Sequence, residues 1–111
     1  MATEREMNGK GYPKRLDHVV WKVLEGRGVL LNLENGAYFE VNPVGLSIWE
    51  KCDGKKSSGA IVQSVAREFK EDLERVQRDF SRFAAELKRR KLLEVSPAPS
   101  AAGAPVLKKT R

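Results

Sequence analysis

Three segments in the first half of the chain alternate apolar and polar side chains with a period of two, as strands with one buried face do. The segments cover about residues 18–25, 28–34 and 37–41. Glycines within 26–28 provide a tight turn after the first segment, and the Asn-Gly pair at 35–36 predicts a type I′ hairpin turn after the second. We therefore expect a three-stranded antiparallel sheet in meander order.

The most specific stretch of the sequence, from Gly36 to Gly54, predicts a strand that turns directly into a short helix. Asn42 can accept a hydrogen bond from the first helical turn, and Pro43 suits the first helical position, where no N–H is needed. Gly54 is the residue type that ends a helix in the left-handed conformation. The apolar face of this helix carries Val44, Ile48 and Cys52.

After Gly54 the apolar period changes from two to 3.6, which predicts two more helices. Ser57 or Ser58 can cap the first of them, and Asp72 can cap the second. Residues 92–95 follow as a short strand or extended segment. The apolar stripes of the two helices comprise Ile61, Val62, Val65, Ala66 and Phe69, then Leu73, Val76, Phe80, Phe83, Ala84 and Leu87.

A chain of 111 residues allows one domain, whose core must form by packing the sheet against the helices. We expect an α+β domain that is winged-helix-like, with a three-stranded antiparallel sheet followed by three helices and a short C-terminal strand. This domain covers residues 16–95. Residues 1–15 are expected to form a flexible N-terminal segment, and residues 96–111, rich in Ala, Pro, Ser and Gly, a disordered C-terminal tail.

The net charge of +6 raises the question of an acidic partner. The segment 16–95, however, carries fourteen bases against thirteen acids, so most of the excess lies at the two ends, which keep the protein soluble or make weak contact with an acidic partner. No apolar run approaches the ~20 residues that cross a bilayer. With Cys52 as the single cysteine and no signal peptide, we expect a cytoplasmic protein without contact to a membrane.

The sequence offers no constellation of catalytic or metal-binding side chains. His18 is the only histidine, so one chain cannot form a histidine-based metal site or a catalytic triad. Cys52 lies on the apolar face of a helix, where a buried and inert thiol is expected. We therefore expect a protein that is not an enzyme and that needs no cofactor.

The pattern predicts buried positions for the two tryptophans and an outward-facing position for Tyr38. Trp21 and Trp49 lie where the pattern points inward, so both are expected in the core. Tyr38 lies on the other face of its strand, where an exposed aromatic side chain would indicate a binding partner. The basic run at 88–91 fits the C-terminal end of a helix dipole better than a nucleic-acid patch.

The segment from about Leu16 to Glu94 resembles the PqqD family, the peptide chaperones also known as RiPP precursor-peptide recognition elements. The residues that carry this resemblance are Gly36, Tyr38, Asn42, Gly45, Ile48, Trp49, Asp53, Gly54, Ile61, Val62, Phe69, Val76, Asp79, Phe83, Leu87, Leu92, Leu93 and Glu94. Each is weak alone, but the ordered set at these spacings is fairly specific. One departure is Lys91, at a position where such proteins usually have Gly.

The resemblance implies the same order of three strands and three helices, and it also implies a function. Such proteins bind the leader segment of a ribosomally made precursor peptide and present it to a modifying enzyme, often a radical SAM enzyme. The leader adds as a strand to the edge of the third strand, and its apolar side chains enter a groove formed with the third helix.

Carried onto this sequence, the resemblance implies a peptide-binding strand edge and one flank of the third helix. The expected peptide-binding residues are Ala37, Tyr38, Phe39, Glu40 and Val41 on the strand and Arg75, Asp79, Arg82, Phe83 and Glu86 on the helix. The opposite flank, with Gln77, Ser81 and Lys88, is the alternative wall for the groove. We expect a monomer or a strand-exchanged dimer, because an unpaired strand edge invites pairing between chains.

Two other functions fit the same fold. A winged-helix protein can bind nucleic acid, but the third helix mixes acids with its bases, which makes a poor surface for phosphates. The chain can also be the adaptor subunit of an enzyme complex, using the same edge to bind folded protein. A steep fall of DNA affinity with salt would favour the first alternative, and a folded partner would favour the second.

Overall fold

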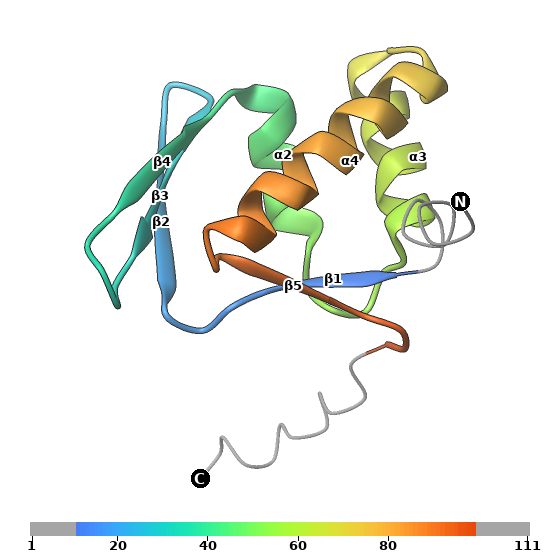
Figure 1. Ribbon diagram of the computed structural model, residues 1–111. Coiled ribbons are helices and arrows are strands. Elements are labelled where there is room, and N and C mark those ends of the chain that lie inside the picture. Colours follow the sequence, from blue (N-terminus) through green and yellow to red (C-terminus); the bar gives the residue numbers. More distant parts are fainter. Residues whose placement is uncertain (1–10, 100–111) are drawn as a thin grey trace, which may run out of the picture.

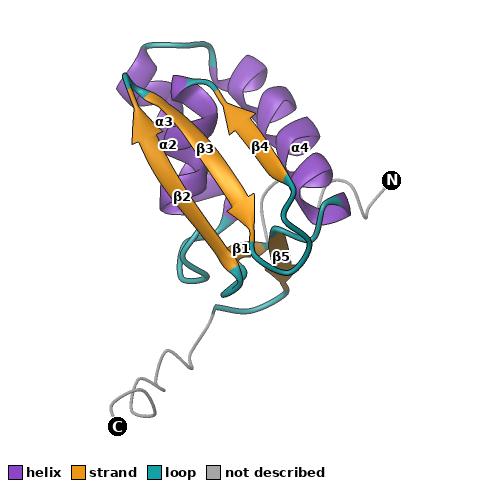
Figure 2. Ribbon diagram, turned by 90° about the vertical axis from the view of Figure 1, so that its left-hand side faces the viewer, coloured by secondary structure: helices purple, strands orange, loops and turns teal. Residues whose placement is uncertain are grey.

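The structure is a computed structural model that describes residues 11–99 of the chain (Figure 1). The elements along the chain are β1 (Tyr12–Arg15), β2 (Val19–Leu24), β3 (Arg27–Asn32), β4 (Tyr38–Val41), α2 (Pro43–Lys51), α3 (Ser58–Phe69), α4 (Leu73–Arg89) and β5 (Leu93–Ser96). Strands β2, β3 and β4 form an antiparallel sheet in that order. All three helices lie on one side of this sheet, as Figures 1 and 2 show from two directions. The predicted α+β architecture is therefore confirmed.

The start of the domain differs from the prediction, because part of the expected flexible segment is a strand. β1 pairs antiparallel with β5, so that Tyr12 lies opposite Ser96 and Arg15 opposite Leu93. Pro13 is fully buried. The sequence gives no periodic signal here because the strand is four residues long and its partner lies about eighty residues later. The other residues of the predicted flexible ends, 1–10 and 100–111, lie outside the described part of the chain.

The prediction of a type I′ turn at Asn35-Gly36 is wrong. Gly36 has a positive φ of 76° but Asn35 does not, and the Gly36 N–H donates to the Asn32 carbonyl across a longer loop. The turn with positive φ at both central residues is Glu25-Gly26, between β2 and β3. Asn32 and Asn35 accept hydrogen bonds from backbone N–H groups two residues onward, which stabilises the longer loop.

The core fills the space between the sheet and the helices, and its two tryptophans have different environments. Trp49 is 0% exposed, as predicted, but Trp21 is 37% exposed. Trp21 packs edge-to-face against Trp49, with ring centroids 5.6 Å apart, and the Arg15 guanidinium lies 4.9 Å from its ring centre. Trp21 stays partly exposed because β2 is an edge strand. The largest other fully buried side chains are Leu30, Ile61, Leu87 and Val65.

Helix α2 begins directly after β4, as the sequence predicts. The Asn42 side chain accepts a hydrogen bond from the Gly45 N–H at 2.8 Å, and Pro43 occupies the first turn. Gly45 lets the helix approach its neighbours closely, because a Cβ atom there would lie 3.2 Å from Val41 Cβ and 3.4 Å from Phe83 Cζ. α2 is thereby held against both β4 and α4.

A polar cluster fixes the other side of α2 to α3. The buried Ser47 hydroxyl donates to a Glu68 carboxylate oxygen at 2.6 Å, and the Lys51 ammonium lies 2.8 Å from Ser47 Oγ and 3.1 Å from Glu68. The hydrogen bond from Ser47, together with Lys51, lowers the pKa of Glu68 below its ordinary value. The cluster thus favours the ionised carboxylate in the folded state.

We expect the Glu68 carboxylate to make the stability of the domain depend on pH. Because folding lowers its pKa, the stabilisation is fully present above the unfolded-state pKa of about 4.3 and is lost as the pH falls through the folded-state value. Glu68→Gln should therefore lower the free energy of unfolding at pH 7 and have a smaller effect at pH 3. Urea titrations at both pH values test this, with Glu50→Gln on the exposed side of α2 as the control. If Glu68→Gln lowers the stability by the same amount at both pH values, the assignment is contradicted.

The turn after α4 contains Lys91, the residue that stands where PqqD-family proteins usually have Gly. Lys91 has a φ of 62°, the left-handed conformation that glycine adopts most easily. Lys91 and Leu92 close the helix with hydrogen bonds from their N–H groups to the Lys88 and Leu87 carbonyls. The His18 ring contacts the Lys91 carbonyl at 2.9 Å, so His18 ties the start of β2 to this turn.

Candidate functional site

A groove of about 500 Å³ lies between the edge of the sheet and the helices. Strand β4 forms one wall, α4 forms the other, and α2 forms the floor. Figure 2 shows α4 running beside β4, along the border of the sheet that β4 forms. The lining residues are Phe39, Glu40, Val41, Asn42, Val44, Gly45, Ile48, Glu71, Arg75, Val76, Asp79, Arg82 and Phe83.

The backbone of β4 presents unpaired polar groups toward this groove. The Asn32 N–H donates to the Ala37 carbonyl, and hydrogen-bonded pairs alternate along an antiparallel ladder. Ala37, Phe39 and Val41 therefore direct their N–H and C=O groups toward β3. Tyr38 and Glu40 direct theirs away from it, and no described strand pairs with that side of β4.

The predicted flank of α4 faces the groove, and the opposite flank does not. The helix buries Val76, Phe80, Ala84 and Leu87 against the core. Arg75, Asp79, Arg82 and Phe83 lie beside this buried stripe and line the cavity, whereas Gln77, Ser81 and Lys88 do not. The sequence alone does not show which flank of α4 faces β4, because helical periodicity identifies the buried stripe but not the element that lies beside each flank.

Aromatic rings form the apolar part of the two walls. Phe39 of β4 and Phe83 of α4 stack with centroids 6.5 Å apart and an angle of 26° between their planes. The Arg90 guanidinium lies 4.6 Å from the centre of the Phe39 ring. Arg90 is held by an ion pair with Glu86. The hydrogen bond from Arg90 is the largest cause that lowers the pKa of the Glu86 carboxyl, and the hydrogen bond from Arg89 is the second. One end of the aromatic wall is therefore covered by a fixed cation.

The charged rim of the groove is only loosely paired. Arg75 lies 3.8 Å from Glu71, and Arg82 lies 3.6 Å from Asp79, both longer than a normal hydrogen bond. These four side chains are substantially exposed. Exposed pairs of this kind contribute little to stability, so these charges can rearrange around a ligand without a large loss.

Of the ten residues predicted from the sequence, seven line the cavity. Ala37, Tyr38 and Glu86 do not, although Tyr38 lies on the same strand and is 68% exposed. The prediction omitted the residues of the floor and the far end, which are Asn42, Val44, Gly45, Ile48, Glu71 and Val76. The close packing of Gly45 could not be read from the pattern, because it depends on how α2 is placed against β4 and α4.

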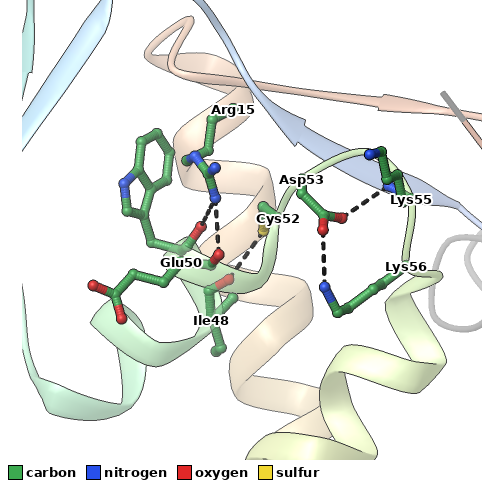
Figure 3. A network of polar contacts seen from close by, with 8 residues as sticks. Arg15, Ile48, Glu50, Cys52, Asp53, Lys55 and Lys56 are labelled. Atoms are coloured by element: carbon green, nitrogen blue, oxygen red, sulfur yellow. Dashed lines mark hydrogen bonds and ion pairs between the residues drawn. The ribbon is translucent and has the colours of Figure 1, made fainter. Parts of the chain in front are cut away.

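Elsewhere the described residues show packing rather than reactive chemistry. Burial raises the pKa of the Cys52 thiol to about 12, and the thiol donates to the Ile48 carbonyl (Figure 3). Arg15 donates to the Trp49 and Glu50 carbonyls at the end of α2. Within residues 11–99 no group of His, Cys, Asp and Glu side chains could hold a metal ion. None of the described helices is long and apolar enough to cross a membrane.

Comparison with known proteins decides the family. The model of the family described as "Coenzyme PQQ synthesis protein D (PqqD)" matches residues 27–93, which include the β4 edge and α4. The chain belongs to the PqqD family. A search among curated proteins finds no significant match.

A solved structure of a similar protein supports this PqqD assignment and contains a peptide. It is described as TbiB1 in complex with the TbiA(beta) leader peptide. The two chains share 34% sequence identity with a TM-score of 0.66, and the match covers 73% of this chain and 94% of TbiB1. This PqqD-family chain therefore shares its fold with a protein that binds a leader peptide.

Proposed function

We propose that this PqqD-family protein binds the leader of a ribosomally made precursor peptide by strand addition to β4. The observation that carries the proposal is the free backbone of Tyr38 and Glu40 beside a groove with apolar walls. An extended peptide can pair with such an edge through its main chain, while its alternate side chains enter the groove. The bound leader of TbiB1, which shares this fold, supports the same ligand class for this chain.

In this account each part of the groove has one role. The N–H and C=O groups of Tyr38 and Glu40 hold the peptide backbone, which gives affinity without selecting a sequence. Phe39 and Phe83 contact apolar peptide side chains, and Arg75 and Arg82 at the rim contact polar ones. The protein is non-catalytic: it holds the leader in the cytoplasm and presents the remainder of the precursor to a separate modifying enzyme, with radical SAM enzymes as the first class to test.

We expect Phe83→Ala to weaken leader binding about tenfold, which corresponds to about 1.4 kcal/mol. Phe83 forms the apolar wall opposite β4 and stacks on Phe39, so its loss removes the surface that a peptide side chain would contact. Gln77→Ala, on the opposite flank of α4, is the matched control and should bind as the unmodified protein does. Fluorescence anisotropy with a labelled leader segment of a precursor encoded beside the gene measures both variants.

The same titration separates this proposal from nucleic-acid binding. A short DNA duplex should bind weakly and without dependence on Phe83. If Phe83→Ala and Gln77→Ala bind the leader equally, the groove is not the leader-binding site. If DNA binds tightly and loses affinity steeply with salt, nucleic-acid binding is the better account of the function.

A further inference from the structure

The sheet has a second free edge, on β2, whose surface is more apolar than that of β4. In Figure 2 β2 forms the left-hand border of the sheet, and no described strand pairs with its outer side. Val20, Trp21, Val23 and Leu24 are all exposed, and Lys22 is the only charged residue of the strand. A long apolar edge of this kind pairs readily with another strand unless charges or prolines protect it.

The register of β2 shows which of its backbone groups are free. The Leu33 N–H donates to the His18 carbonyl, and this bond fixes the alternation of hydrogen-bonded pairs along β2 and β3. Every second residue from His18 onward therefore bonds to β3. Val19, Trp21 and Val23 direct their N–H and C=O groups outward. The Val19 N–H already donates to the Leu16 carbonyl at 3.3 Å, so the groups available to a new strand are those of Trp21 and Val23 and the Val19 carbonyl.

We infer that β2 pairs antiparallel with β2 of a second copy of this chain, around a two-fold axis at Trp21. In this register Trp21 lies opposite the partner's Trp21, and Val19 lies opposite the partner's Val23. Trp21 can then exchange two hydrogen bonds with the partner's Trp21, and the Val23 N–H can donate to the partner's Val19 carbonyl, with apolar side chains opposite apolar side chains.

Lys22, the single charged residue of β2, favours this register and favours a second copy of the chain as the partner. A shift of the axis to Lys22 would place two ammonium groups directly opposite each other, which is unfavourable. With the axis at Trp21, Lys22 lies opposite the partner's Val20 instead. A strand with one central lysine and apolar residues around it is therefore complementary to itself, as a two-fold interface requires.

The resulting dimer has one continuous six-stranded sheet, with the two β4 strands at its outer edges. Both grooves stay open, so dimer formation and leader binding do not compete. The inference stands on β2 alone and does not rest on the proposed peptide ligand. Pairing of two edge strands covers a small area, so we expect the dimer to dissociate on dilution.

Two measurements on the full chain without peptide test the inference. They are sedimentation velocity and amide hydrogen exchange, each over a concentration series. The mass should rise from 12.5 kDa toward twice that value. The Trp21 and Val23 amides should become protected as it rises, while the Tyr38 and Glu40 amides should not. A monomer at every concentration overturns the inference, as does a dimer that protects the β4 edge.

Proline substitutions at the two edges provide a reciprocal check. Val23→Pro removes an outward N–H of β2 without removing a bond to β3, so it should abolish the dimer and leave leader binding intact. Glu40→Pro changes the other edge and should leave the dimer intact. Val23→Lys, with Leu33→Lys as a control at a similarly exposed position off the edge, gives the same comparison if the proline variant does not fold. Dimers of equal stability in Val23→Lys and Leu33→Lys overturn the inference.

Discussion

Glu40→Pro is expected to weaken leader binding by about 10- to 100-fold while leaving the domain folded. The Glu40 N–H points away from β3, so proline removes a hydrogen bond to the peptide without breaking the sheet. The peptide carbonyl that loses its donor then stays unsatisfied in the complex, which costs about 1–3 kcal/mol. Isothermal titration calorimetry with the cognate leader segment measures the loss.

Two other substitutions separate the backbone of this position from its side chain and from the sheet. Glu40→Ala keeps the N–H, so it should lose much less affinity than Glu40→Pro. Phe39→Pro removes an N–H that faces β3 and should destabilise the sheet itself. If Glu40→Ala and Glu40→Pro bind equally well, the leader does not pair with the β4 backbone.

Trp49→Ala is expected to lower the free energy of unfolding by about 3–5 kcal/mol. The Trp49 side chain is fully buried and contacts Trp21 edge-to-face, so truncation leaves a large cavity at the end of α2. Because small domains are stable by only about 5–15 kcal/mol, this one change removes much of the total. Urea denaturation followed by circular dichroism measures it.

Trp21→Ala is the comparison that tests this account of the core. Trp21 is partly exposed, so its removal should cost only about 1–2 kcal/mol through loss of the aromatic pair and of the Arg15 contact. Equal losses for the two tryptophans would contradict the different burial of the two rings.

The sequence predicts the elements that have a strong local signal. The caps at Asn42 and Asp72 occur as predicted, and Ser57, one of the two candidates, caps α3. Each of these caps is a hydrogen bond within one turn of helix, so it depends on neighbouring residues alone. The strand periods also place Tyr38 correctly on the exposed face.

Features that depend on distant contacts were predicted poorly. β1 exists because β5 pairs with it, and nothing within Tyr12–Arg15 indicates that partner. Trp21 has the same apolar pattern as a core residue, but its exposure follows from the position of β2 at the edge of the sheet. The floor of the groove was missed for the same reason, since Val44 and Ile48 belong to an ordinary apolar helix face until α2 is placed beneath the edge.

The most direct test of peptide binding is an amide NMR titration of the isotope-labelled full chain with the leader segment of a precursor encoded beside its gene. We expect shifts concentrated at Tyr38 and Glu40 and along the Arg75–Phe83 flank of α4, with new protection of the Tyr38 and Glu40 amides against exchange. Shifts confined to other surfaces, or a β4 edge that stays silent to every leader while DNA shifts α4 in a salt-sensitive way, would contradict it.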